Sequence, residues 1–145
     1  MRLIQFYREF SRLGEYLNSL ALLLARFVVA FGFFDPAMMK WGDIDSVAAW
    51  FGSMGIPLPL LSAYLAASTE AAGVVLLTFG LLTRFIALPL VVVMLVAIFS
   101  VHIGNGFSAE NNGFEIPLYY LIFLLIFIAN GAGRFSLDHL FFEKK

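Results

Sequence analysis

The stretch "IPLPLLSAYLAASTEAAGVVLLTFGLLT", from Ile56 to Thr83, contains a single charged residue, Glu70. A helix needs about 20 mostly apolar residues to cross the hydrocarbon core of a bilayer, and this stretch exceeds that length. The whole chain is 61% hydrophobic and 13% charged, whereas soluble domains are about a quarter charged. The sequence therefore predicts an all-α membrane protein, in which one carboxylate within a span indicates a functional site.

Four apolar segments are candidates for membrane spans. No repeat, low-complexity tract or linker separates them into domains. We therefore expect one four-transmembrane-helix bundle over residues 1–145, with spans at about residues 17–34, 57–82, 85–102 and 116–133.

The residues before the first span have the pattern of an amphipathic helix. Apolar residues recur there at helical spacing, opposite a face that carries Arg2, Arg8, Glu9 and Arg12. We expect residues 1–16 to form an interfacial helix on the membrane surface, where plain anchoring is the simplest role.

Lysine and arginine accumulate in cytoplasmic loops, so their distribution predicts the orientation of the spans. If four spans alternate, one side receives Arg2, Arg8, Arg12, Arg84, Arg134, Lys144 and Lys145, and the other receives Lys40 alone. Both termini are therefore predicted to be cytoplasmic.

Two charges fall inside the predicted spans, Arg26 in the first and Glu70 in the second. A helical rise of about 1.5 Å per residue places them at similar depth, because Arg26 is about 13 Å and Glu70 about 18 Å from the cytoplasmic ends of their spans. A buried carboxylate and a buried guanidinium relieve each other's burial cost when they pair. We therefore expect an Arg26–Glu70 contact, which either fixes the helix register or takes part in proton or ligand handling.

Further polar residues lie at the opposite membrane boundary, at the ends of three predicted spans. We expect them to converge there as ligand-binding residues: Asp35, Lys40, His102, Glu115 and Tyr119.

Two interpretations of this second group are open. His102, Glu115 and Asp35, with Met38 or Met39, are candidate metal ligands, but no HxxxH, ExxH or CxxC spacing supports them. The alternative is the polar mouth of an apolar cavity that suits the headgroup of a quinone or another lipid-like molecule. Glu70 and His102 are then the candidates for proton exchange.

The composition also excludes some functions. Without cysteine the chain has no thiolate redox centre and no cysteine-ligated cofactor. A basic footprint for nucleic acid is absent, since the formal net charge is -1.

The order of these residues resembles the DoxX family of small four-span bacterial membrane proteins, from about Leu20 to Leu140. Six features carry the resemblance: Arg26, Lys40, the block "GIPLPLLSAYLAASTEAAG" with Glu70, "GLLTR" from Gly80 to Arg84, "VH" ending at His102, and "GRFSLD" from Gly133 to Asp138. One position departs from the family pattern. Where many members have His-Gly, this chain has Asp35-Pro36 followed by "AMMKW", which is similar to a branch linked to copper-responsive peptide maturation.

The resemblance implies a multi-pass protein of the bacterial inner membrane, often a subunit of an oxidoreductase. We accordingly expect a membrane subunit that binds a quinone around Arg26, Glu70 and His102, serves a partner protein, and forms no complete enzyme by itself. A homo-oligomer is also compatible with the sequence. The alternative is a non-enzymatic scaffold, or a protein that handles a metal or small solute, with a structural Arg26–Glu70 pair.

Overall fold

The computed structural model describes residues 2–143, and within them every regular element is helical. Three residues lie outside the described part of the chain. They are Met1, from the predicted interfacial helix, and Lys144 and Lys145, from the basic residues predicted on the cytoplasmic side. Five α-helices form the body: α1 (Arg2–Gly42), α2 (Ile44–Ser53), α3 (Pro59–Phe79), α4 (Thr83–Ala97) and α5 (Glu115–Asn130). Short helical turns complete the chain: η1 (Ile98–His102), η2 (Ile103–Asn105), η3 (Ala109–Asn111) and η4 (His139–Glu143).

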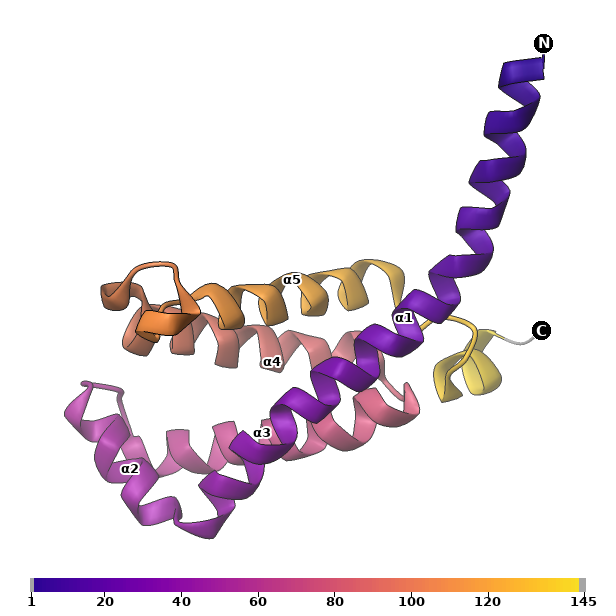
Figure 1. Cartoon of the computed structure of the whole chain (residues 1–145). Helices are drawn as coiled ribbons and strands as arrows, with labels where there is room; N and C mark the ends of the chain where they lie inside the picture. The colour runs from indigo at the N-terminus through magenta and orange to yellow at the C-terminus, as the bar shows by residue number, and fades with distance from the viewer. Residues whose placement is uncertain (1, 144–145) are drawn as a thin grey trace.

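Helix α1 is longer than the sequence suggested. It is one 41-residue helix that includes both the expected interfacial segment and the first span, and it continues through Pro36 to Gly42. Gly14 is the only residue between Arg2 and Leu20 with a low helix propensity, so no sequence signal strong enough to end the helix occurs there. Figure 1 shows the first turns of α1 leading away from the other helices.

Three helical stretches are long and apolar enough to cross a membrane: α1, α3, and the run from Thr83 to Asn105 that contains α4. Helix α5 is also apolar but has 16 residues. Residues 35–56, between the first two predicted spans, are mostly helical because they contain the end of α1 and all of α2.

Asp43 caps α2, where its Oδ1 accepts the Ser46 backbone N–H at 3.1 Å.

The helices pack as two pairs. Helix α1 lies along α3, and α4 lies along α5 (Figure 1). Each partner buries a stripe at helical spacing: Leu22, Arg26, Val29, Phe33 and Ala37 on α1, and Ala63, Ala67, Glu70, Gly73 and Leu77 on α3. The predicted spans thus contribute both charges, Arg26 and Glu70, to one helix interface.

Glycine permits close approach at two points between the helices. A Cβ atom on Gly73 would lie 2.8 Å from Leu90 Cδ1, so α3 and α4 touch there. A Cβ atom on Gly32 would overlap the Tyr120 hydroxyl, so the ring of Tyr120 lies directly against the α1 backbone.

Candidate functional site

Arg26 is fully buried at the end of the bundle where the chain's C-terminal segment docks. Its Nη1 donates to the carbonyl oxygens of Leu77 at 2.8 Å and Thr78 at 3.4 Å, in the last turn of α3. Its Nη2 donates to the Phe135 carbonyl oxygen. A cation at the C-terminal end of a helix interacts favourably with the helix dipole and with the carbonyl groups that lack intrahelical partners. Arg26 therefore fastens α1 to α3 and to the C-terminal segment.

Asp138 completes this structure from the C-terminal segment. Its carboxylate oxygens accept the backbone N–H groups of Leu82 at 2.7 Å and Thr83 at 2.9 Å, and its own N–H donates to the Gly80 carbonyl at 2.9 Å. Leu82 has a φ of 51°, so Asp138 holds an unfavourable left-handed residue at the start of α4. We call the contacts of Arg26 and Asp138 with residues 77–83 and Phe135 the C-terminal clasp.

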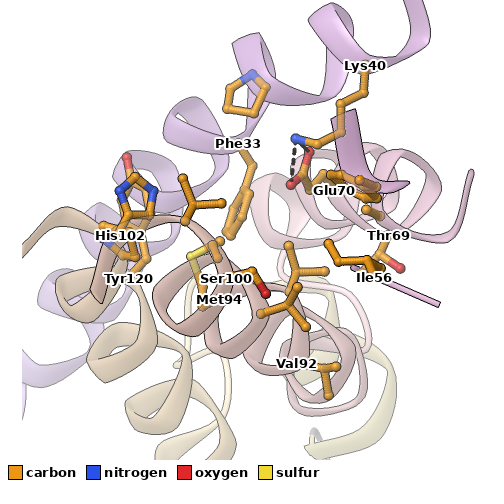
Figure 2. A pocket seen from close by; sticks show the side chains of 18 of the residues that line it. Phe33, Lys40, Ile56, Thr69, Glu70, Val92, Met94, Ser100, His102 and Tyr120 are labelled. Atoms are coloured by element: carbon orange, nitrogen blue, oxygen red, sulfur yellow. Dashed lines mark hydrogen bonds and ion pairs between the residues drawn. The ribbon is translucent and has the colours of Figure 1, made fainter. Parts of the chain in front are cut away.

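A cavity of about 670 Å³ lies at the other end of the bundle, near α2. Its walls come from α1, α2, α3, α4, η1 and α5, and they are mostly apolar. Among the described residues on these walls, the lysine, carboxylate and histidine side chains are Lys40, Glu70 and His102 (Figure 2). We call this space the central cavity.

Lys40 and Glu70 form an ion pair on the cavity wall. Lys40 Nζ lies 2.9 Å from one carboxylate oxygen of Glu70 and 3.1 Å from the other. The side chains are 14% and 3% exposed, so both charges are largely removed from solvent. Next to Lys40 on the same helix, Trp41 donates its indole N–H to the Ala67 carbonyl of α3 at 3.2 Å. The pair is therefore held in place by its own helices and faces a space large enough for a ligand.

His102 lies across the cavity from Glu70, beside Tyr120 (Figure 2). Its Nδ1 is 2.9 Å from the Asn112 carbonyl oxygen, so when Nδ1 carries the proton the other ring nitrogen is a hydrogen-bond acceptor. His102 ends η1, a π-helical turn that follows α4. Such turns occur often at functional sites, and this one places Ser100, Val101 and His102 on the cavity wall.

A second break in regular hydrogen bonding occurs in α1, where Pro36 lies inside the helix. Proline has no N–H, so the carbonyl group of Gly32, four residues earlier, loses its normal helical donor. Gly32 and Pro36 both line the central cavity. The break in the helical hydrogen bonding of α1 therefore lies beside the cavity.

The predicted contact between Arg26 and Glu70 is wrong, because Arg26 binds carbonyl groups of the clasp and Glu70 binds Lys40. The two residues do not lie at the same level of the bundle, because Arg26 contacts the carbonyl groups of Leu77 and Thr78, about 10–12 Å along α3 from Glu70. The direction of the side chains increases this separation. Helical side chains lean toward the N-terminus of their helix. In the antiparallel helices α1 and α3, Arg26 and Glu70 lean away from each other, whereas Lys40 and Glu70 lean toward each other.

The predicted convergence of polar residues is found only in part. Lys40 and His102 line the central cavity, but Asp35 is exposed and is not on its walls. Glu115 and Tyr119 bind one another at 2.8 Å, and Glu115 also accepts the Ala109 N–H at 2.9 Å.

The candidate metal ligands are not brought together. Met38 is half exposed and is not on the cavity wall, whereas the neighbouring Met39 is. Within residues 2–143 no group of three or more His, Asp or Glu side chains has the arrangement of a metal site.

The profile of the DoxX family matches residues 21–103. This chain belongs to the DoxX family. Two uncharacterised proteins of Haemophilus influenzae are 37% and 35% identical to it over 127 residues, which cover 85% of this chain and 84% and 92% of theirs. A Bacillus subtilis protein named "Putative oxidoreductase CatD" is 32% identical over 124 residues, 85% of this chain and 88% of its own. No solved structure matches the chain.

The DoxX match includes Arg26, Lys40, Glu70 and His102. It therefore covers the cation of the clasp and the lysine, glutamate and histidine of the cavity wall. The family and the three long apolar helices identify the chain as a membrane protein.

Sequence reasoning missed Tyr120, Gly32 and Pro36 as parts of the cavity wall. The four-residue spacing of Gly32 and Pro36 is a usable signal, because it marks a free carbonyl group on one face of a helix. Nothing in the sequence distinguishes Tyr120 from Tyr119, since only the packing against Gly32 selects it.

Proposed function

We propose that this DoxX protein binds a quinone or a comparable hydrophobic redox molecule in the central cavity and serves a redox system as its membrane subunit. The observation that carries the proposal is an ion pair that is largely shielded from solvent and lines an apolar cavity of about 670 Å³. That volume lies within the about 300–1,000 Å³ usual for small-molecule pockets, which combine apolar walls with a few polar groups. The name of the Bacillus subtilis relative points to the same class of chemistry.

Reduction of a quinone to a quinol takes up two electrons and two protons. In our proposal Glu70 and His102 exchange the protons at the ligand oxygens, and a partner protein supplies the electrons. Lys40 orients the Glu70 carboxylate, because its Nζ lies 2.9 Å and 3.1 Å from the two carboxylate oxygens. Arg26 has a structural function in this proposal, since its hydrogen-bond partners lie in the clasp.

We also propose that α5 is a fourth span and that both termini face the cytoplasm of a bacterial cell, with the protein in the inner membrane. Helix α5 runs beside α4 and is apolar after Glu115. The distribution of lysine and arginine supports this orientation. A reporter enzyme that works only in the periplasm can be fused to either terminus. Activity of such a fusion would contradict this orientation.

The test is the quinone content of protein purified gently from its native membrane. Wild type is compared with Glu70→Gln, and with Glu115→Gln as a control, because the Glu115 carboxylate does not line the cavity. We expect about one quinone per chain in wild type and the control, and at least a tenfold loss in Glu70→Gln at equal helicity. A wild type without quinone contradicts the redox proposal, and unchanged content in Glu70→Gln leaves the ion pair a structural element.

A further inference from the structure

Several residues on the cavity wall also lie on the outer surface of the protein. On α4 they are Pro89, Val92 and Val96, and Ser100 of η1 follows at the same helical spacing; all four are exposed. On α3 the corresponding residue is Leu65, which is 59% exposed. A side chain that touches both the cavity and the surface lies at an opening, so one opening of the cavity lies between α3 and α4. Met39 of α1 and Ile116 of α5 are also exposed residues of the cavity wall.

The packing of α3 against α4 explains the position of this opening. The two helices touch where Gly73 meets Leu90, and the turn Gly80–Leu82 joins them at the clasp end. Toward α2 they diverge, as Figure 1 shows. Trp50, Met54 and Ile56, from α2 and the residues after it, line the cavity at that end. The opening is therefore a lateral one, bounded by the Gly73–Leu90 contact at one end and the α2 region at the other.

The chemistry of this opening changes from its edge to its interior. Leu65, Val92 and Val96 at the edge carry only apolar side chains, on the faces of helices that a bilayer would surround. The ion pair of Lys40 and Glu70 lies at the inner wall, with 14% and 3% of the side chains exposed. A molecule with an apolar chain and a polar head matches this order, because the chain fits the edge and the head reaches the charges.

We propose that the gap between α3 and α4 is a lateral portal through which a membrane-dissolved, chain-bearing molecule enters the central cavity directly from the bilayer. The proposal rests on the function proposed above for the identity of the head, but not for the existence of the portal. It identifies the ligand as lipid-soluble and makes Val92 and Leu65 the residues that limit its entry.

The portal can be tested without a known ligand because the chain has no cysteine. Ala66→Cys introduces one thiol on the cavity wall. In proteoliposomes, we measure the rate at which this thiol reacts with an alkyl-chain maleimide. The rate is compared between the Ala66→Cys variant and a double variant that also carries Val92→Trp, which would fill the portal. The matched control is Leu88→Trp, one turn away on α4, equally exposed and not on the cavity wall. Leu65→Trp, with Leu61→Trp as its control, repeats the test from α3 if Val92→Trp fails to fold.

We expect the portal substitutions to slow the reaction at least tenfold and the controls to change it less than twofold. A charged, membrane-impermeant maleimide should react slowly in every variant. Equal rates in the portal variants and the control variants overturn the proposal. A faster reaction with the charged maleimide than with the alkyl-chain maleimide also overturns it. Protection of the thiol by a long-chain quinone supports the proposed function as well, whereas a portal-dependent reaction without such protection keeps the portal and rejects quinone as the ligand.

Discussion

The C-terminal clasp and the central cavity each contain a buried cation from α1, and the two cations have different partners. Arg26 donates to backbone carbonyl groups of α3 and of the C-terminal segment. Lys40 binds the carboxylate of Glu70, whose other side faces open space. The two residues are fourteen positions apart on the same helix, a distance of about 21 Å along its axis.

This difference separates a structural charge from a functional one. Carbonyl groups at a helix end cannot change their protonation state, so a cation bound to them can only hold the fold together. A carboxylate beside a cavity can exchange a proton and can gain or lose a ligand. The chemistry of their partners therefore distinguishes the two charges.

The largest effect is expected at the clasp. Arg26→Leu removes the donors to the carbonyl groups of Leu77 and Phe135, and leaves the buried Leu77 carbonyl with only the Gly80 N–H at 3.3 Å. Hydrogen bonds to charged groups contribute about 1.5–3 kcal/mol each, so we expect a loss of about 3 kcal/mol or more in the free energy of unfolding. The measurement is unfolding in mixed micelles followed by circular dichroism.

Arg84→Leu is the control for this experiment, because Arg84 is exposed and reaches only the Ala129 carbonyl at 3.4 Å. It should unfold close to wild type. If the two variants unfold alike, Arg26 does not hold the clasp.

A slightly smaller effect is expected for Gly80→Ala. Gly80 has a φ of 65°, and a Cβ atom there would lie 2.4 Å from Arg26 Nη1 and 2.6 Å from Ser136 Cβ. Left-handed strain costs about 1–2 kcal/mol and crowding adds about 1–3 kcal/mol, so we expect a loss of about 2–5 kcal/mol in unfolding free energy.

Gly55→Ala separates these two causes. Gly55 has a φ of 77° but no atom within 4 Å of the added Cβ, so only the backbone strain applies. The same unfolding assay should show a clearly smaller loss than for Gly80→Ala. Equal losses would mean that the clasp tolerates the added methyl group.

At the cavity, the comparison predicts that stability and binding respond differently. Lys40→Met leaves the Glu70 carboxylate without its cation, and Glu70→Gln in the same chain removes the remaining charge. We expect the double variant to regain about 1–2 kcal/mol of the unfolding free energy lost by Lys40→Met, because contacting residues are usually coupled by about 0.5–3 kcal/mol. Quinone content should stay low in both variants. Recovery of binding along with stability would show that the charges themselves are not needed.

The sequence allowed prediction of the helical content and of the residues that carry charge into the bundle. Glu70 was selected because ionisable groups are rare in apolar segments, and Lys40 and His102 were selected because they lie near the ends of predicted spans. Their pairing could not be predicted from depth alone. The pairing depends on the direction in which antiparallel helices project their side chains. It also depends on the register of α1 against α3, which could not be predicted because α1 is longer than the expected first span.

The clasp was missed for a different reason. Its main acceptors are backbone carbonyl groups of Leu77 and Phe135, and a sequence does not mark which carbonyl groups are left free. The "GLLTR" and "GRFSLD" segments were recognised as motifs, but only the structure shows that they bind one another through Asp138.

The smallest effect is expected at Asp43, outside both regions. Hydrogen bonds from the side chain and backbone of Ser46 lower the pKa of Asp43. A lowered pKa stabilises the fold above the unfolded value of about 3.9, and this contribution is lost as the pH falls through the lower folded value. Asp43→Asn should therefore show a slightly weaker fall in melting temperature between pH 5 and pH 3 than wild type. Asp45→Asn is the control, and an unchanged pH profile in Asp43→Asn would exclude this capping effect.

The clasp joins segments that are synthesised at different times. Arg26 is synthesised early, but its Phe135 acceptor lies 109 residues later in the chain. During synthesis the guanidinium group must therefore enter or wait beside the membrane before its full set of partners exists. The segment around Phe135 thus completes the burial of a charge from the first helix. We therefore expect removal of this segment to impair membrane insertion as well as stability.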